Sequence, residues 1–265
     1  MITTTAFDDN DDVTTDSKQT LIEKYHNELL DFVSDHGYNQ QAILWNQAVL
    51  RLPKEADEIN WNAMMDYIQM LHKSTTVARK VLEQSDEYKK RNILMWILRV
   101  KKLAPSAEKV IALILKLTTP KIIYHKDSDG CTCFHHALEY GSSVDIIRLL
   151  VSSAIFNNNN SVVAEVLLEK NKYDDTPLHL GMYNATTKQD DDPQKFKDVI
   201  AYIVDICPQT LEIPNRDGIT PIHLAIEEKR SIGIINYLLG RCSKDILLKL
   251  AKEETTNIYY NNHTM

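Results

Sequence analysis

Two cysteines and two histidines stand closest together among the residues that could bind a metal or take part in catalysis. They form the run Cys131-x-Cys133-x-His135-His136, in which two thiolates and an imidazole could ligate zinc. No second Cys/His pair stands at zinc-finger spacing, so a zinc site is not predicted. Cys207 is interpreted as an apolar core residue, because it stands at the C-terminal end of a predicted helix, which disfavours a thiolate.

Other catalytic and cofactor-binding patterns are missing from the sequence. The 265 residues include only 7 glycines, and a phosphate-binding loop needs several of them close together. The motifs Gly-x-Ser-x-Gly and His-Glu-x-x-His do not occur. The acidic run Asp190–Asp192 lacks the alternating ligands of a calcium loop and is interpreted as a solvated loop. We therefore predict a protein that is not an enzyme, with no catalytic, cofactor-binding or metal-binding residues.

Charge and the length of the apolar runs argue against a nucleic-acid-binding protein and a membrane-spanning protein. The net charge is −7, and no basic stripe typical of a nucleic-acid-binding surface is present. The longest apolar runs, Ile93–Leu98 and Val110–Leu115, are far shorter than the roughly 20 residues of a membrane span. The N-terminus is acidic and unlike a signal peptide. We expect a cytoplasmic or nuclear protein that is not secreted.

The elements that must position these residues are helices. Apolar residues recur at helical spacing from Lys18 to about Leu117, and the few glycines argue against a β-sandwich. Trp45, Trp61 and Trp96 fall at apolar positions and are expected in the core. Residues 157–160, four asparagines, and residues 185–194 are predicted loops.

An internal repeat organises the second half of the chain. Three segments read alike: residues 129–137 (DGCTCFHHA), 173–181 (YDDTPLHLG) and 217–225 (DGITPIHLA). Thr132, Thr176 and Thr220 can cap a first helix, and Pro177 and Pro221 then occupy its first turn, where a missing N–H costs nothing.

A second helix follows in each unit. Its apolar phrase stands at residues 146–150, 199–203 and 234–238, and begins 14, 23 and 14 residues after the threonine. From the phrase to the next threonine there are 30 and then 21 residues. The extra residues of the first unit therefore follow its second helix, whereas those of the second unit lie between its two helices. A similar phrase at residues 110–114 predicts a degenerate unit upstream.

These segments resemble the ankyrin repeat, whose signature is Asp-Gly-x-Thr-Pro-Leu-His-x-Ala with a period near 33 residues. The resemblance implies an all-α, helix-turn-helix solenoid with short β-hairpin turns, preceded by a helical N-terminal region. It also implies that His135, His179 and His223 form hydrogen bonds across units. Cys133, Gly181 and Asp174 depart from the signature. The predicted structural motif comprises Thr132, His135, Thr176, Pro177, His179, Thr220, Pro221 and His223.

The predicted organisation has four parts. Residues 1–17 form a disordered acidic tail, 18–91 a helical region, 92–252 the ankyrin-repeat domain and 253–265 a flexible tail. Within the repeat domain, 92–125 is the degenerate repeat, 126–242 holds the clear repeats and 243–252 forms a cap.

The resemblance implies an adaptor or scaffold that binds another protein on a concave surface, without nucleic acid or membrane insertion, and a monomer is expected. Two alternatives stay open: a substrate-recognition subunit of a ubiquitin ligase, and an enzyme with a helical N-terminal catalytic region. The mixed charge of the hairpin turns predicts a partner of mixed or modestly basic character. The predicted contact residues lie in these turns: Lys126, Asp127, Ser128, Asp129, Lys172, Tyr173, Asp174, Asn215, Arg216 and Asp217.

Overall fold

The computed structural model describes residues 61–71, 75–83, 85–86, 88–100, 103, 105–154, 160–183 and 193–261. The predicted all-α class is confirmed, since no strand occurs in these ranges and a single isolated bridge joins Ser85 and Asn92. The helical elements are α3 (Trp61–Leu71), α4 (Thr75–Leu82), α5 (Ile93–Leu98), α6 (Pro105–Leu117), α7 (Lys121–Tyr124), α8 (Cys133–Glu139), α9 (Val144–Ala154), α10 (Asn160–Leu168), α11 (Pro177–Tyr183), α12 (Pro193–Ile206), η3 (Pro208–Leu211), α13 (Pro221–Glu227), α14 (Ile232–Leu239) and α15 (Lys244–Asn261).

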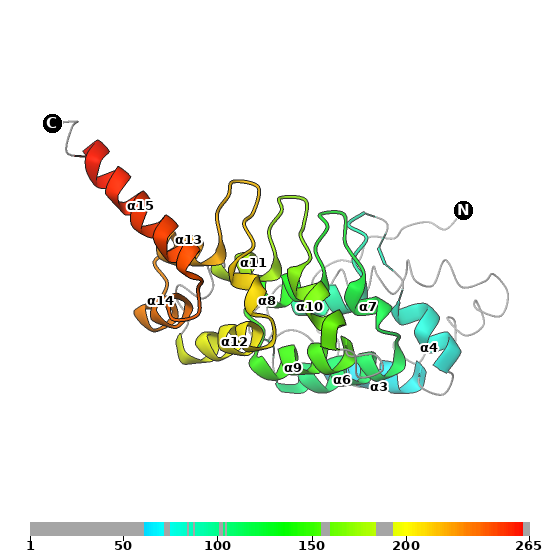
Figure 1. The fold of residues 1–265 in the computed structure, drawn as a ribbon. Coiled ribbons are helices and arrows are strands. Elements are labelled where there is room, and N and C mark those ends of the chain that lie inside the picture. Colours follow the sequence, from blue (N-terminus) through cyan, green and yellow to red (C-terminus); the bar gives the residue numbers. More distant parts are fainter. Residues whose placement is uncertain are drawn as a thin grey trace, which may run out of the picture.

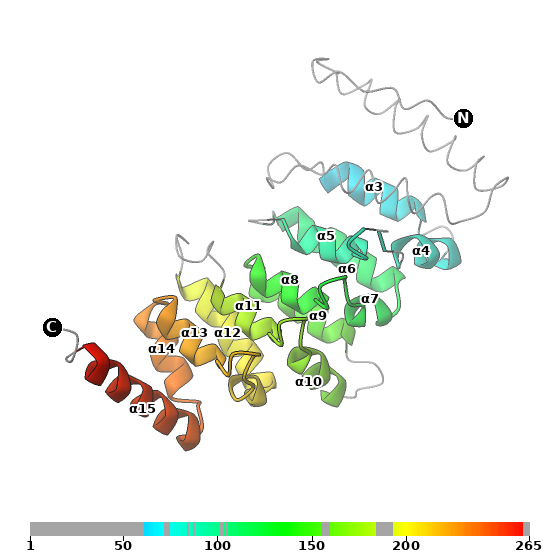
Figure 2. The same cartoon turned by 90° about the horizontal axis from the view of Figure 1, so that it is seen from above.

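The helices stack in two parallel rows. The first helices form an inner row in which α5 contacts α8, α8 contacts α11 and α11 contacts α13 (Figure 2). The second helices form an outer row of α6, α9, α12 and α14, and α3 packs on α6 at its N-terminal end. The turns before α8, α11 and α13 project to one side of the array, opposite the outer row (Figure 1).

Short helices follow three of the second helices. α7 packs on α8, α10 on α11 and η3 on α13, so each contacts the first helix of the next unit. α10 holds most of the extra residues that the sequence places after the second helix of the first unit. It begins at Asn160, so the last asparagine of the predicted loop is helical.

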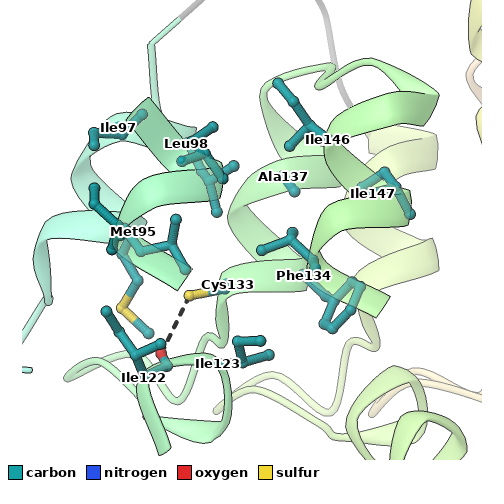
Figure 3. Close-up of a cluster of buried hydrophobic side chains, with 14 of the residues drawn as sticks. Met95, Ile97, Leu98, Ile122, Ile123, Cys133, Phe134, Ala137, Ile146 and Ile147 are labelled. Atoms are coloured by element: carbon teal, nitrogen blue, oxygen red, sulfur yellow. Dashed lines mark hydrogen bonds between the residues drawn. The ribbon is translucent and has the colours of Figure 1, made fainter. Parts of the chain in front are cut away.

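The core between the rows consists of two clusters of buried residues, one over α3 to α10 and part of α12, and the other over α11, the rest of α12 and α13 to α15. Residues of α5, α7, α8 and α9 meet around Phe134, which is fully buried, and the Sγ of Cys133 donates to the carbonyl oxygen of Ile122 at 3.4 Å (Figure 3). Trp61 is buried and Trp96 partly buried, as expected, whereas Trp45 lies outside the described residues.

The threonine caps form through a reciprocal contact with histidine. Thr132 and Thr220 are N-caps with extended backbone, and each forms a capping box with the histidine three residues later. Pro221 occupies the first turn of α13, as predicted.

The last helix ends later than the predicted end of the cap. α15 runs on to Asn261, past the predicted end of the cap at Lys252 and into the segment expected to be a flexible tail. Three predicted features lie outside the described residues: the acidic tail 1–17, the helices predicted before Trp61 and the acidic run Asp190–Asp192.

Candidate functional site

Three turns project from the array with the same internal construction. We call them tip 1 (residues 127–131), tip 2 (residues 171–175) and tip 3 (residues 215–219). In each, the first side chain accepts the backbone N–H groups of the third and fifth residues at 2.8 to 3.1 Å, and its own N–H donates to the fifth carbonyl. These first residues are Asp127, Asn171 and Asn215. Short Asx side chains favour such turns because they can bond their own backbone.

The fourth residue of each tip has a positive φ. It is Gly130 (78°), Asp174 (62°) and Gly218 (77°). Glycine adopts this conformation without steric cost, and Asp tolerates it better than most residues. Asp174 therefore departs from the repeat signature but keeps its backbone geometry.

Backbone hydrogen bonds join the tips into a ladder. The N–H of Lys172 donates to the carbonyl oxygen of Asp129 at 2.9 Å, and that of Arg216 to the carbonyl oxygen of Tyr173 at 3.3 Å. Ser128 makes the same bond to Lys89, in the loop before α5, at 2.8 Å. In tips 2 and 3 the donor is the second residue of the tip and the acceptor is the third residue of the preceding tip. These equivalent bonds hold the tips in fixed register.

Two histidines join α8 and α11 to the tip of the following unit. The Nδ1 of His135 accepts the N–H of Thr132 at 3.0 Å, and its Nε2 donates to the carbonyl oxygen of Asp175 at 3.1 Å. His179 repeats this arrangement with Thr176 and Ile219. Burial lowers the pKa of His135 to about 3 and also lowers that of His179, so both are neutral.

A family model of the ankyrin repeat matches residues 129–162, which hold tip 1 from its third residue, α8, α9 and the start of α10. Residues 129–162 therefore form an ankyrin repeat. The comparison with curated proteins gave no match. The two later repeats carry the same tip and the same His-to-Thr contact as the matched one.

A buried ionic network supports the tip of the matched ankyrin repeat. The carboxylate of Asp127 accepts the Nε of Arg91 and the Nε2 of His136, each at 3.0 Å. Burial by itself would raise the pKa of Asp127, but these bonds and the N–H of Cys131 hold it well below its ordinary value. Tips 2 and 3 begin with Asn, which needs no counter-charge.

The predicted contact residues divide into two groups. Asp127 and Asn215 are 5 % and 7 % exposed and hold their tips from within, so neither side chain is available to a partner. The other eight are exposed or half-buried: Lys126, Ser128, Asp129, Lys172, Tyr173, Asp174, Arg216 and Asp217. Asp129 pairs with Lys172, and Lys126 with Glu169, which follows α10.

Tyr173 is the one aromatic residue of the three tips. Its side chain is 53 % exposed, and both Lys172 and Arg216 lie over its ring, 5.0 and 5.9 Å from the centroid. Arg216 also donates to the carbonyl oxygen of Lys172. Aromatic and arginine side chains are enriched among the residues that dominate binding energy at protein interfaces.

The inner-row helices add surface residues that sequence reasoning missed. Arg99, half-buried at the end of α5, lies over the ring of Tyr140 at 4.7 Å. Tyr183, at the end of α11, is 39 % exposed. Arg99 and Tyr183 both stand seven residues after the N-cap position of their helix, so the repeat period itself could have marked them.

The four residues of the Cys131–His136 run contact separate partners. The Sγ of Cys131 accepts the Nδ2 of Asn171 at 3.8 Å, and His136 donates to Asp127. Burial raises the pKa of Cys131 to about 12 and also raises that of Cys133, so both are thiols at neutral pH. Within the described ranges, no group of three His, Cys, Asp or Glu side chains could hold a metal. No helix in those ranges has the length and apolar character of a membrane span.

Proposed function

We propose that this protein is a non-catalytic interaction module that binds a partner protein on the concave surface formed by its tips and inner-row helices. Ankyrin repeats typically act by binding other proteins. The observation that carries the proposal is the ladder of three tips in fixed register, with Tyr173 exposed between Lys172 and Arg216. Such pre-ordered contact groups lower the entropic cost of binding.

The proposed repeat domain begins upstream of the three clear units. α5 packs on α8 as α8 packs on α11, and the N-cap Asn92 stands where the later units have threonine. In the loop before α5, Asp86 accepts the N–H of Arg91 at 2.8 Å, and Trp96 donates to Asp86 at 3.1 Å, as His136 does to Asp127. These parallels support the degenerate repeat predicted at residues 92–125 and add a turn before it that contains Asp86 and Arg91. The predicted separate helical region, residues 18–91, would then end at this turn.

A capture experiment with the full chain tests the interaction module. The Y173A/R216A variant removes the exposed ring and guanidinium from the tips. The matched control, D145A/R148A, removes an exposed ion pair from α9 in the outer row. Both variants should keep the circular-dichroism melting curve of the wild type, because these side chains are exposed.

Co-purifying proteins are then quantified by mass spectrometry. We expect a set of proteins that the wild type and the control capture equally and that Y173A/R216A loses. Capture that Y173A/R216A leaves unchanged would refute the proposed surface. The identities of the captured proteins also distinguish an adaptor or scaffold from a ubiquitin-ligase subunit. Components of a ubiquitin ligase among them would favour the ligase subunit. Cytoplasmic or nuclear localisation and a monomeric state remain parts of the proposal.

A further inference from the structure

Tyr183 is an exposed residue at the end of α11, next to tip 3 and to several carboxylates. The hydroxyl of Tyr183 accepts the Nδ2 of Asn215 at 3.4 Å, which places its ring beside the tip. Burial raises the pKa of Tyr183, and the negative charges of Asp175, Glu227 and Asp217 raise it further. Asn215 also donates to the carboxylate of Asp175 at 2.9 Å and accepts the N–H of Asp217 at 3.1 Å. α13, which ends at Glu227, packs on α11, which ends at Tyr183. These contacts bring three carboxylates to the end of α11 where Tyr183 lies.

These carboxylates have no counter-charge in the described part of the chain. Asp217 and Glu227 are exposed, and neither forms an ion pair there. Asp175 is only 6 % exposed, and the group that donates to its carboxylate is the neutral amide of Asn215, at 2.9 Å. A buried carboxylate is ordinarily paired, because losing its hydration costs free energy.

Tyr183 differs in this respect from other aromatic residues on the same side of the array. Tyr88, Tyr140 and Tyr173 each lie beneath a lysine or arginine of the chain. Among the described residues, no cation lies over the ring of Tyr183. Arg230 reaches the end of α11, but it donates to the carbonyl oxygen of Met182 and lies over Phe196.

We propose that Tyr183, Asp217 and Glu227 receive a lysine or arginine side chain of the partner. The ring face attracts the cation, and the carboxylates supply hydrogen-bond acceptors for it. The inference rests on the proposed function and adds the chemistry of the partner, which carries a basic side chain at this contact. It also agrees with the net charge of −7, which attracts basic partners over longer distances.

A single-cation probe tests this contact in the full chain. The probe is the peptide acetyl-Ala-Ala-Arg-Ala-Ala-amide, and its control carries citrulline, which has nearly the shape of arginine without the charge. Tyrosine rings are labelled with ¹³C, and the signal of Tyr183 is assigned as the one missing from Y183F. We expect the arginine peptide, and not the citrulline peptide, to shift this signal.

Two charge-matched variants locate the effect. D217N/E227Q removes the two exposed carboxylates beside Tyr183, and D145N/E165Q removes two exposed carboxylates from α9 and α10. We expect the first variant to weaken the apparent affinity by about fivefold or more and the second to leave it unchanged. Tyr183 shifts that the citrulline peptide matches, or that survive D217N/E227Q, would overturn the inference.

The two proposals fail in different experiments. If Tyr183 does not respond to arginine while Y173A/R216A still loses captured proteins, the basic contact is wrong and the interaction module stands. If Tyr183 responds as expected but Y173A/R216A loses nothing, the cation site stands and the proposed tip surface fails.

Discussion

The Nε2 of His135 donates to the carbonyl oxygen of Asp175 at 3.1 Å, which joins α8 to the fifth residue of tip 2. The opposite ring nitrogen, Nδ1, accepts the N–H of Thr132, so the neutral imidazole satisfies one group in its own unit and one in the next. A protonated ring could not accept the threonine N–H. The junction between the first two clear repeats therefore depends on a neutral histidine.

Acid should destabilise the array through this residue. The folded pKa of His135 is about 3, below its ordinary value of 6.5, so between these values the unfolded chain binds the proton and the folded chain does not. Stability therefore falls as pH falls, by about 2 kcal/mol per such histidine between pH 7 and pH 5. Urea unfolding at the two pH values measures this. The H135Q variant should be less stable at pH 7 and should show a smaller loss on acidification, and an equal loss would contradict the assignment.

Two glycines at the same position of different tips should respond differently to alanine. A Cβ on Gly130 would lie 3.2 Å from the backbone nitrogen of Lys172, whereas a Cβ on Gly218 would meet nothing within 4 Å. Both variants force alanine into a positive φ at a cost of about 1 to 2 kcal/mol. We expect G130A to lose more stability than G218A, because tip 2 packs on Gly130. Thermal unfolding of the two variants tests this, and equal losses would argue against that close packing.

Gly181 offers a stabilising change. It lies inside α11 where the other two repeats have alanine, and a Cβ there would stand 3.4 Å from the Cβ of Leu138 and 3.9 Å from the Cδ1 of Ile200. Replacing a helical glycine by alanine gains up to about 1 kcal/mol. We expect G181A to raise the melting temperature. A lower melting temperature would mean that the methyl group does not fit between α8 and α11.

The carboxylate of Asp127 should be needed for more than the shape of tip 1. D127A removes both the tip bonds and the partner of the buried Arg91, and such uncompensated buried charges cost about 3 to 5 kcal/mol. D127N keeps an oxygen for the N–H groups of Asp129 and Cys131 but loses the negative charge. We expect D127N to lose less stability than D127A in denaturant unfolding. Equal losses would show that the charge, and not the tip bonds, accounts for the effect.

The sequence by itself determined the helical class and the ankyrin resemblance, and the resemblance implied the role of the repeat histidines. Local chemistry suffices for these features: a threonine before a helix, a glycine at a positive φ and an apolar phrase at helical spacing leave their marks in consecutive residues. The charge balance and the few glycines also gave reasons to expect no nucleic-acid or phosphate-loop function.

Only the tertiary structure decided which polar residues of the tips are exposed. Asp127 and Asp129 are two residues apart with the same side chain, yet Asp127 is buried because Arg91 and His136 reach it from other elements. Likewise, the negative charges of Asp175, Asp217 and Glu227 raise the pKa of Tyr183, and the latter two residues belong to the next repeat. Burial and charge pairing depend on contacts between units, and residue types along the chain do not record which unit-to-unit contacts form.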